Sequence, residues 1–353
     1  MSEGFRPGTG VRLLASAMDA YKTVFVEAPA ARVLSRPSPV RRSGYDRTVV
    51  IDRVETVADD VVRLTLRDPR RELLPAWTPG AHLDVFLPSG RQRQYSLNGD
   101  PADRASYRIA VRRIADGGGG SVEVHDTLRA GDPLRIRGPR NAFPFIAAGS
   151  YLFVAGGIGI TPILPMVAEA ARAGIPWRLV YVGRSRASMP FLAELSRLRG
   201  GELVVRPDDE FGVAAPADLV ESVRADTSVY VCGPPALMDA ACARVAALDP
   251  AVALHTERFS ALPVRDGVEF DVALTRTGRT VRVGAEESAL NAIRRVVPGV
   301  AYSCQQGFCG TCKVGVLDGT VEHRDRLLSD ADRPDSMLIC VSRSRGGELT
   351  LDL

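Results

Sequence analysis

The spacing of hydrophobic residues sets the first 45 residues apart from the rest of the chain. In residues 11–28, Leu14, Met18, Tyr21 and Phe25 recur at the spacing of one helical face, and residues 34–44 are polar and rich in proline and arginine. This pattern predicts one amphipathic helix followed by a linker. Such a helix either packs on the body of the protein or is mobile, or it docks on a partner or a membrane, and the sequence leaves these alternatives open.

Apolar and polar residues alternate in short runs through residues 46–147. Six such runs cover residues 48–55, 60–68, 81–87, 93–98, 106–114 and 132–139, with Pro, Gly and Asp between them. Closely spaced alternating runs are typical of antiparallel strands with one buried face. We therefore expect a six-stranded antiparallel β-barrel here.

The pattern changes at about residue 148 to continuous apolar runs that alternate with amphipathic segments. The runs cover residues 151–157, 177–184, 202–207 and 228–234, and the segments cover 160–174, 189–200 and 235–249. Strands buried on both faces and separated by helices predict an α/β domain with a doubly wound parallel sheet over residues 148–262. After a turn-rich stretch near 261–267, residues 263–353 form a third, mostly β unit, with a hairpin at 268–284, a helix at 288–296 and a strand at 337–344.

Composition agrees with a multidomain globular protein and excludes several other classes. The chain has 353 residues, of which 45% are hydrophobic and 25% charged, and its net charge of +3 is too small to indicate a nucleic-acid partner. No apolar run approaches the roughly 18–20 residues of a membrane span, and the first residues lack the basic flank of a secretory signal. Six cysteines are too few for a disulfide framework. We therefore expect a cytoplasmic protein.

Four of the six cysteines follow a spacing that predicts an iron–sulfur site. Cys304, Cys309, Cys312 and Cys340 form C-x4-C-x2-C with a distant fourth member, the plant-type [2Fe-2S] pattern. Gly307 and Gly310 allow tight turns that bring backbone N–H groups toward the cluster sulfur atoms, and Ser303 and Thr311 could add hydroxyl donors. A structural zinc site more often has two C-x2-C pairs, and buried thiols with no common role are the third alternative.

Two strand-to-helix turns in the α/β region have the composition of a nucleotide site. Gly156, Gly157 and Gly159 follow the first strand and precede Pro162, and the segment Cys232-Gly233-Pro234 follows the fourth strand. Turns at the carboxyl ends of parallel strands meet in one crevice, where a pyrophosphate can lie against a helix N-terminus. Each motif alone could be an ordinary tight turn.

The barrel region carries residues suited to a flavin. Arg93 suits a phosphate, the ring of Tyr95 can lie on an isoalloxazine, and the Ser96 hydroxyl can reach a ring heteroatom. A glycine run before Ser121 opens a helix-like segment, which is another phosphate seat. Read singly these signals are weak, because Tyr95 could be a core residue and the glycine run a flexible loop.

Taken together these motifs resemble a known family. RxYSL at 93–97, GGS-x3-H at 119–125, AGGIGITP at 155–162, CGP at 232–234 and HTERF at 255–259 stand ahead of a unit similar to a plant-type ferredoxin of the α+β, β-grasp class. Over residues 46–353 the chain resembles the phthalate dioxygenase reductase family of the ferredoxin-NADP reductase superfamily. The resemblance implies FMN in the barrel, NADH in the α/β domain and electron transfer to an oxygenase.

The resemblance also implies roles for individual residues. Flavin contacts are expected from Arg93, Gln94, Tyr95, Ser96, Leu97, Ala110, Val111, Arg112, Gly119, Gly120, Ser121, Thr161 and Phe259. Nucleotide contacts are expected from Gly156, Gly157, Gly159, Thr161, Pro162, Gly183, Arg184, Ser185, Cys232, Gly233, Pro234 and Met238. Two positions depart from the family pattern: Gly118 replaces an arginine of the glycine-rich loop, so that Arg112 or Arg113 could supply a phosphate contact instead, and Gln305 replaces a residue that is often acidic.

The expected function follows from electron counting. Nicotinamide delivers two electrons as a hydride, whereas the cluster accepts one at a time, so a flavin must stand between them. This chemistry needs no acid, base or nucleophile from the protein, and His82, His125, His255 and His323 are read as structural residues. Cys232 is expected to pack beside the nicotinamide and Cys242 to lie in the core.

Several choices stay open on the sequence alone. NADPH remains an alternative because of Arg184 and Arg186, and FAD remains an alternative to FMN. The partner is a Rieske nonhaem iron oxygenase or a cytochrome P450, bound in a transient complex. Two other functions are a flavin oxidoreductase that reduces a small acceptor by itself, and a nonenzymatic redox-sensing module.

Overall fold

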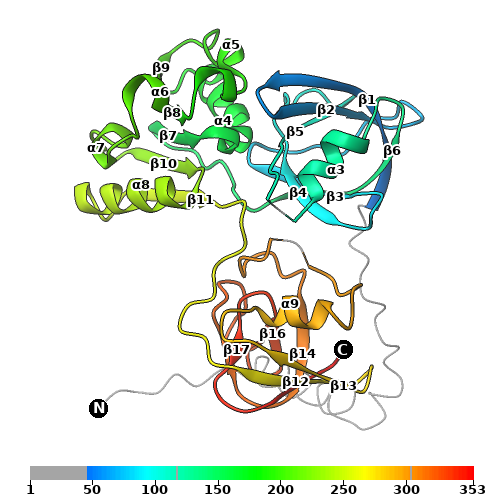
Figure 1. Cartoon of the computed structure of the whole chain (residues 1–353). Coiled ribbons are helices and arrows are strands. Elements are labelled where there is room, and N and C mark those ends of the chain that lie inside the picture. The colour runs from blue at the N-terminus through cyan, green and yellow to red at the C-terminus, as the bar shows by residue number, and fades with distance from the viewer. Residues whose placement is uncertain (1–45, 117, 303) are drawn as a thin grey trace, which may run out of the picture. The chain divides into compact units, whose positions relative to one another are not determined.

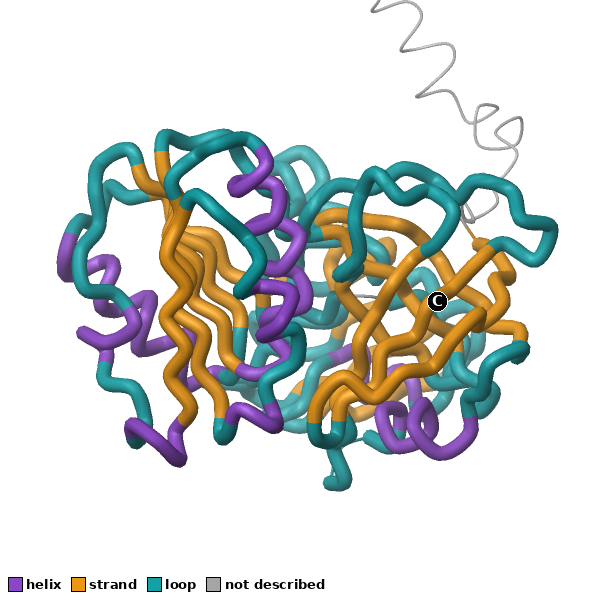
Figure 2. The backbone as a smooth tube through the Cα atoms, turned by 90° about the horizontal axis from the view of Figure 1, so that it is seen from above, coloured by secondary structure: helices purple, strands orange, loops and turns teal. Residues whose placement is uncertain are grey.

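The computed structural model describes residues 46–116, 118–302 and 304–353 (Figure 1). The predicted N-terminal helix and linker, as well as Gly117 and Ser303, lie outside the described residues. Three sheets of five or six strands fall within residues 46–141, 150–257 and 270–351. In Figure 2 the strands of residues 150–257 stand apart on the left, whereas the strands of the other two sheets overlap in this view. The exact domain boundaries stay predictions.

The first sheet has six strands in the order β4-β3-β6-β1-β2-β5, and the predicted antiparallel barrel is confirmed. Its end strands meet, because Leu97 bridges Ile109 and the Asn98 N–H donates to the Arg108 carbonyl at 2.9 Å. The elements are β1 (Asp46–Ala58), β2 (Val61–Arg67), β3 (Ala81–Phe86), β4 (Gln92–Ser96), β5 (Tyr107–Arg112), α3 (Gly120–Thr127) and β6 (Pro133–Asn141).

The second sheet is parallel, with the order β11-β10-β7-β8-β9, and confirms the doubly wound prediction. The strand order reverses between β7 and β10, which places the switch point of the sheet at their carboxyl ends. The elements are β7 (Ser150–Gly156), η2 (Gly157–Gly159), α4 (Ile160–Arg172), β8 (Trp177–Gly183), η3 (Arg186–Ser188), α5 (Leu192–Leu195), β9 (Gly201–Pro207), α6 (Asp208–Phe211), α7 (Pro216–Leu219), β10 (Thr227–Cys232), α8 (Pro235–Leu248) and β11 (Ala253–Glu257).

The predicted helix at 189–200 is wrong in its length, because only the four residues of α5 are helical. Phe191, just before α5, has φ of 69°, in the left-handed region that interrupts a right-handed helix. The apolar residues of this segment still pack on the core: Phe191 and Leu195 are buried and Leu198 is partly buried against the same cluster. The apolar pattern that predicts a helix at 189–200 therefore reflects the burial of these side chains.

The third sheet has the order β13-β12-β18-β14-β16, with β12 and β18 parallel, and a separate pair joins β15 to β17. The predicted hairpin and helix are confirmed by β12, β13 and α9. The predicted strand at 337–344 is wrong, because β16 ends at Leu338 and Cys340 lies in the following turn. The elements are β12 (Phe270–Leu274), β13 (Arg279–Val283), α9 (Ala289–Arg294), β14 (Lys313–Asp318), β15 (Val321–Glu322), β16 (Ser336–Leu338), β17 (Arg343–Ser344) and β18 (Leu349–Leu351).

Each sheet has its own hydrophobic core, but the barrel and the α/β region also share apolar contacts. Val61, Ala110 and Phe143 of the barrel region belong to the same buried cluster as Ile160 and Met166 of α4. The third region forms a cluster of its own around α9. The shared cluster packs the barrel against α4, the helix that follows the first predicted nucleotide turn.

A buried arginine organises the third region. Arg343 is 1% exposed, and its guanidinium donates to the carbonyls of Val268 and Gly284 at 2.9 Å each and to that of Glu287. The same group lies 5.0 Å from the ring centre of Phe270, a cation–π contact. A buried cation is tolerated only with such partners, so Arg343 ties the segment before β12 to the segment before α9.

Replacing Arg343 with Ala should destabilise the third region strongly. Three carbonyls would lose their donor, and we expect the free energy of unfolding to fall by about 3 kcal/mol, the upper range for one hydrogen bond to a charged group. The thermal transition of this region and the rate of cluster loss measure the effect. The exposed Arg345, two residues away, is the matched control, and an equal effect of R345A would contradict the role given to Arg343.

Candidate functional site

A cavity of about 230 Å³ lies at the seam of the barrel and α4. All the predicted flavin residues line it except Leu97, which is fully buried in the barrel core, and Gly119. Its walls also include Ile114, Gly118 and Ile158, which sequence reasoning missed as flavin contacts. Ile158 lies inside the glycine-rich turn at 155–162, where the sequence predicts a flavin contact only for Thr161.

The chemistry of this cavity fits a flavin phosphate and ring. Arg93 donates to the Gly118 carbonyl at 2.6 Å and lies against the first turn of α3. A Cβ on Gly120 would come within 2.5 Å of Arg93 Nε, so only glycine allows this approach. Burial raises the pKa of Tyr95 to about 12, so the phenol stays neutral beside any bound ring. Gly118, the departure from the family pattern, therefore contributes a carbonyl that orients Arg93.

A half-buried acid, Glu257, lies next to Ser96 of the flavin cavity. The Ser96 hydroxyl donates to Glu257 Oε2 at 3.5 Å, a long hydrogen bond. Burial raises the pKa of Glu257 to about 8, which keeps this carboxyl protonated at neutral pH. Glu257 pairs in the sheet with Cys232, and burial together with Glu257 raises the pKa of that thiol well above its ordinary value. Cys232 is therefore a buried, unreactive thiol, and its expected place beside the nicotinamide stays a prediction.

A second cavity, of about 390 Å³, opens at the carboxyl edge of the parallel sheet. Of the predicted nucleotide residues, it is lined by Gly156, Gly157, Gly183, Arg184 and Pro234, whereas Thr161 lines the flavin cavity instead. The remaining predicted residues, Gly159, Pro162, Ser185, Cys232, Gly233 and Met238, do not line it. Their roles in nucleotide binding stay predictions.

Gly159 and Gly233 have a structural reason to be glycine. A Cβ on Gly159 would lie 2.4 Å from the Cys232 carbonyl oxygen, and one on Gly233 would lie 3.0 Å from the Gly156 nitrogen. The two predicted turns therefore meet through their backbones.

Sequence reasoning missed several lining residues of the nucleotide cavity. Asp208 and Ser188 contribute polar groups, and Arg112 lines this cavity as well as the flavin cavity. Burial and then the charge of Arg184 lower the pKa of Arg112, so two guanidinium groups lie near each other at this opening. Asp208 directly follows β9, and the carboxyl end of that third parallel strand was the signal that could have identified it.

The cysteine loop has the backbone and donor set of a plant-type cluster site. Gln305, Gly307 and Gly310 all have positive φ, between 55° and 79°, which winds the loop tightly around its thiols. The thiols interact as two pairs, Cys304 with Cys309 and Cys312 with Cys340. A hydrogen bond from Cys304 lowers the pKa of Cys309, and a hydrogen bond from Cys340 lowers that of Cys312.

Two thiol pairs fit two iron atoms. Within residues 46–116, 118–302 and 304–353, no cluster of three or more His, Cys, Asp or Glu side chains has the arrangement for a single metal ion. A [2Fe-2S] cluster is wider than one ion and is held by four cysteine thiolates. The four cysteines would hold such a cluster, which accepts and releases electrons singly.

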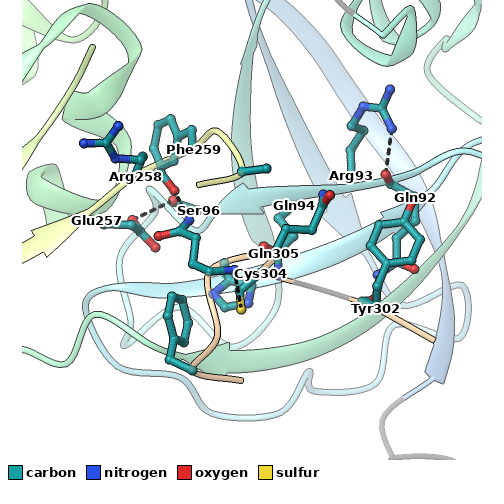
Figure 3. A pocket seen from close by; sticks show the side chains of 14 residues that line it. Gln92, Arg93, Gln94, Ser96, Glu257, Arg258, Phe259, Tyr302, Cys304 and Gln305 are labelled. Carbon is teal, nitrogen blue, oxygen red and sulfur yellow. Dashed lines mark hydrogen bonds between the residues drawn. The ribbon is translucent and has the colours of Figure 1, made fainter. Parts of the chain in front are cut away.

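A third cavity, of about 310 Å³, joins the cysteine loop to the flavin cavity (Figure 3). Arg93, Gln94, Ser96 and Phe259 line both cavities. Figure 3 shows Gln94 and Ser96 from the barrel, Glu257 to Phe259 from the end of β11 and the chain after it, and Tyr302, Cys304 and Gln305 from the cysteine loop around one space. The other lining residues, missed from the sequence, are His82, Gln92, Arg258, Ala261, Tyr302, Gln306 and Phe308.

The four histidines have structural surroundings. Burial, and then the nearby Arg140, lower the pKa of His82 to about 4. His125 Nε2 bonds the Val111 carbonyl at 2.9 Å, His255 stacks on Tyr230, and His323 lies 3.4 Å from the Asp325 carboxylate. Each ring therefore has a neighbour in the framework, and His82 also lines the cavity beside the cysteine loop. The structural role of the four histidines stays a prediction.

Comparison with known proteins agrees with this arrangement. A model for an oxidoreductase FAD-binding domain matches residues 48–145, and a model for a 2Fe-2S iron-sulfur cluster binding domain matches residues 272–345. A phthalate 4,5-dioxygenase oxygenase reductase subunit from Pseudomonas putida is 38% identical over 318 residues, covering 88% of this chain and 97% of the relative. The solved phthalate dioxygenase reductase superposes with a TM-score of 0.68 at 34% identity, covering 90% of this chain and all of that one.

The chain belongs to the phthalate dioxygenase reductase family. It is an NADH-dependent flavin iron–sulfur oxidoreductase and the reductase component of an oxygenase system, which confirms the function expected from the resemblance. A self-sufficient type IV cytochrome P450 monooxygenase also superposes, with a TM-score of 0.70 at 40% identity over 91% of this chain. This reductase spans only 43% of that P450 chain. Among the described residues of the reductase, no helix is long and apolar enough to cross a membrane.

The protonated state of Glu257 predicts a pH-dependent stability. In the unfolded chain this carboxyl ionises near its ordinary pKa of 4.5, whereas in the folded protein it holds its proton up to about pH 8. Unfolding is therefore increasingly favoured as the pH rises through this window. Glu257→Gln removes the effect, and its stability relative to the wild type should rise with pH by at most about 1.4 kcal/mol per pH unit.

Urea unfolding of both proteins at the two ends of this pH window measures the difference. The exposed Glu348→Gln variant is the control and should follow the wild type at every pH. A difference between E257Q and the wild type that does not change with pH would show that Glu257 is ionised in the folded protein.

Proposed function

We propose that this reductase passes electrons from NADH to FMN, then to a [2Fe-2S] cluster, and from the cluster to a separate terminal oxygenase. The observation that carries this proposal is the sharing of lining residues between cavities. Arg112 lines the nucleotide and flavin cavities, and Phe259 lines the flavin cavity and the cavity beside Cys304. Groups bound in these three places would lie in series, as stepwise electron transfer requires.

The flavin supplies the chemistry, since it accepts a hydride pair and releases electrons singly. The chain's own residues bind and orient. Arg93 and Ser121 take the flavin phosphate at the start of α3, and Tyr95 and Val111 lie along the ring. Phe259, which is 51% exposed, closes the site. The protonated carboxyl of Glu257 and the hydroxyl of Ser96 form an uncharged polar edge of the site.

FMN is the proposed flavin, although the matching family model is named for FAD. Arg93 and the N-terminus of α3 together offer one phosphate a positive charge and unpaired N–H groups. A single phosphate is what FMN carries. The mass of the flavin released on denaturation distinguishes FMN from FAD.

The proposed nucleotide is NADH. Arg186 forms a bidentate ion pair with Glu210, with N–O distances of 2.7 and 3.0 Å, which occupies one of the two arginines that could receive a 2′-phosphate. Asp208 lines the nucleotide cavity, and a carboxylate there accepts hydrogen bonds from ribose hydroxyls and repels a phosphate. Arg184 and Arg112 remain for the pyrophosphate.

Replacing Asp208 with Ala should therefore weaken the preference for NADH. We expect the ratio of kcat/KM for NADH to that for NADPH to fall by about tenfold or more, since a hydrogen bond to a charged group contributes roughly 1.5–3 kcal/mol. Steady-state kinetics with both nucleotides measures the ratio. The adjacent exposed Asp209 is the matched control, and equal ratios in D208A and the wild type would exclude Asp208 from the selection.

The proposed partner is a terminal oxygenase of the Rieske nonhaem iron type. The support is the similarity, over nearly the whole length of the relative, to a reductase subunit named for phthalate 4,5-dioxygenase. A cytochrome P450 is the second candidate, supported by the similarity to the reductase part of a P450 fusion. Reduction of each class of oxygenase by the purified reductase and NADH distinguishes them.

Removing one cluster ligand tests the proposed electron route. Cys309→Ala should abolish electron transfer from NADH to cytochrome c, a one-electron protein acceptor, while NADH oxidation with ferricyanide continues from the flavin. Cys242, which is half-buried on α8 outside the site, is the control for loss of a thiol. If C309A reduced cytochrome c as fast as the wild type, the cluster would not lie on the route, and the reading as a reductase of small acceptors would gain.

The cytoplasm is the proposed location. All six cysteines are free thiols, and the four in the cluster pattern must be reduced to bind iron. A reducing compartment keeps them in that state.

A further inference from the structure

One side chain of the barrel reaches into the cysteine loop. Arg140, at the end of β6, donates from Nη1 to Thr311 Oγ1 at 2.9 Å. Thr311 lies between the second and third cysteines of C-x4-C-x2-C. This contact joins the flavin-binding sheet to the cluster-binding loop across 171 residues of sequence.

A buried acid holds Arg140 in this position. The other Nη atom of Arg140 forms an ion pair with Asp84 of β3, whose side chain is completely buried, while the Arg140 side chain keeps 25% of its surface exposed. A buried carboxylate without a cationic partner would be costly. Asp84 therefore fixes where the guanidinium lies, and Nη1 of that group reaches the loop.

The contact continues from Thr311 to a cluster ligand. Cys309 Sγ and Thr311 Oγ1 are 3.4 Å apart, within hydrogen-bonding distance for sulfur. When Cys309 is a thiolate bound to iron, it has no proton, so only the hydroxyl can donate in this contact. Because Arg140 already donates to that hydroxyl oxygen, the O–H group is polarised and becomes a stronger donor to sulfur.

We propose that Arg140 is a positioning residue for electron transfer, which holds the cysteine loop against the barrel and favours reduction of the cluster through Thr311. Each reduction adds one electron, supplied through the flavin from NADH, which is oxidised to NAD⁺. The added negative charge is stabilised by a cation and by hydrogen bonds to sulfur. The same contact that sets the position of the loop therefore also raises the reduction potential.

Two further contacts of this face show why Arg140 is distinctive. Gln92 Nε2 donates to the Tyr302 carbonyl at 2.8 Å, and Gln306 donates to the Arg258 carbonyl. Both are neutral amides that end on backbone atoms. Arg140 contributes a charge and ends on a side chain that touches a cysteine ligand.

The test is the reduction potential of the cluster in the full-length, flavin-loaded protein, followed by electron paramagnetic resonance during a redox titration. Arg140→Gln should make reduction of the cluster about tenfold less favourable relative to the flavin, a shift of about 59 mV for one electron. Thr311→Val should shift the potential in the same direction by a smaller amount, since the hydrogen bond is lost but the cation remains. Thr311→Ser restores the hydroxyl and should keep the wild-type value.

Arg135→Gln is the matched control, because Arg135 lies on the same strand and its guanidinium carbon lies 3.8 Å from the centre of the Phe86 ring. This variant loses the same charge and should leave the cluster potential unchanged. Equal potentials in R140Q and R135Q would overturn the proposal. If R140Q does not assemble a cluster, the threonine variants decide, and a wild-type potential in T311V would overturn it.

The proposal rests on the four-cysteine cluster of the proposed function, and the two can fail separately. A wild-type protein without iron and acid-labile sulfide would remove the proposed electron route itself. A wild-type protein with a normal cluster whose potential is insensitive to Arg140 and Thr311 would remove only the role of this contact.

Discussion

The arrangement of this protein depends on one constraint: groups that exchange electrons must lie close together. Each of the three sheets packs its own core, so none of the binding sites is formed by the interior of a single region. The sites lie where the regions meet, and residues such as Arg112 and Phe259 line two cavities each. Proximity of the carriers is therefore achieved at the seams between cores, and mutations at the seams should affect transfer more than those within a core.

The two seams differ in chemistry. The barrel meets the α/β region through buried apolar residues, among them Val61, Ala110 and Phe143. The barrel meets the cysteine loop through polar contacts, including the bonds from Gln92 to Tyr302 and from Arg140 to Thr311. Apolar burial gives a permanent junction, whereas a small polar junction resembles that of a transient complex. This difference suits a reductase whose last carrier must also face an external partner.

Some glycines that the sequence predicts as ligand contacts also have a role in packing within the protein. Gly159 was expected to contact a nucleotide, yet its lack of a side chain is required by the Cys232 carbonyl, 2.4 Å from where a Cβ would lie. Gly120 was expected near a flavin phosphate, and its lack of a side chain makes room for Arg93. A glycine in a motif thus records a close approach, but the sequence does not say whether the approaching atom belongs to a ligand or to the protein.

The sequence by itself determined the three fold classes, the order of the cofactors and the four cysteines, because periodicity, turn motifs and ligand spacing are local properties of the chain. The same local reasoning failed at residues 189–200 and at Cys340, where burial and a turn, respectively, replaced the predicted helix and strand. Tertiary structure alone decided that Asp208 lines the nucleotide cavity, that Glu257 holds its proton, and that Arg140 reaches Thr311. These facts depend on which surfaces meet when separate cores dock, and no spacing along the chain encodes a contact between residues 171 positions apart.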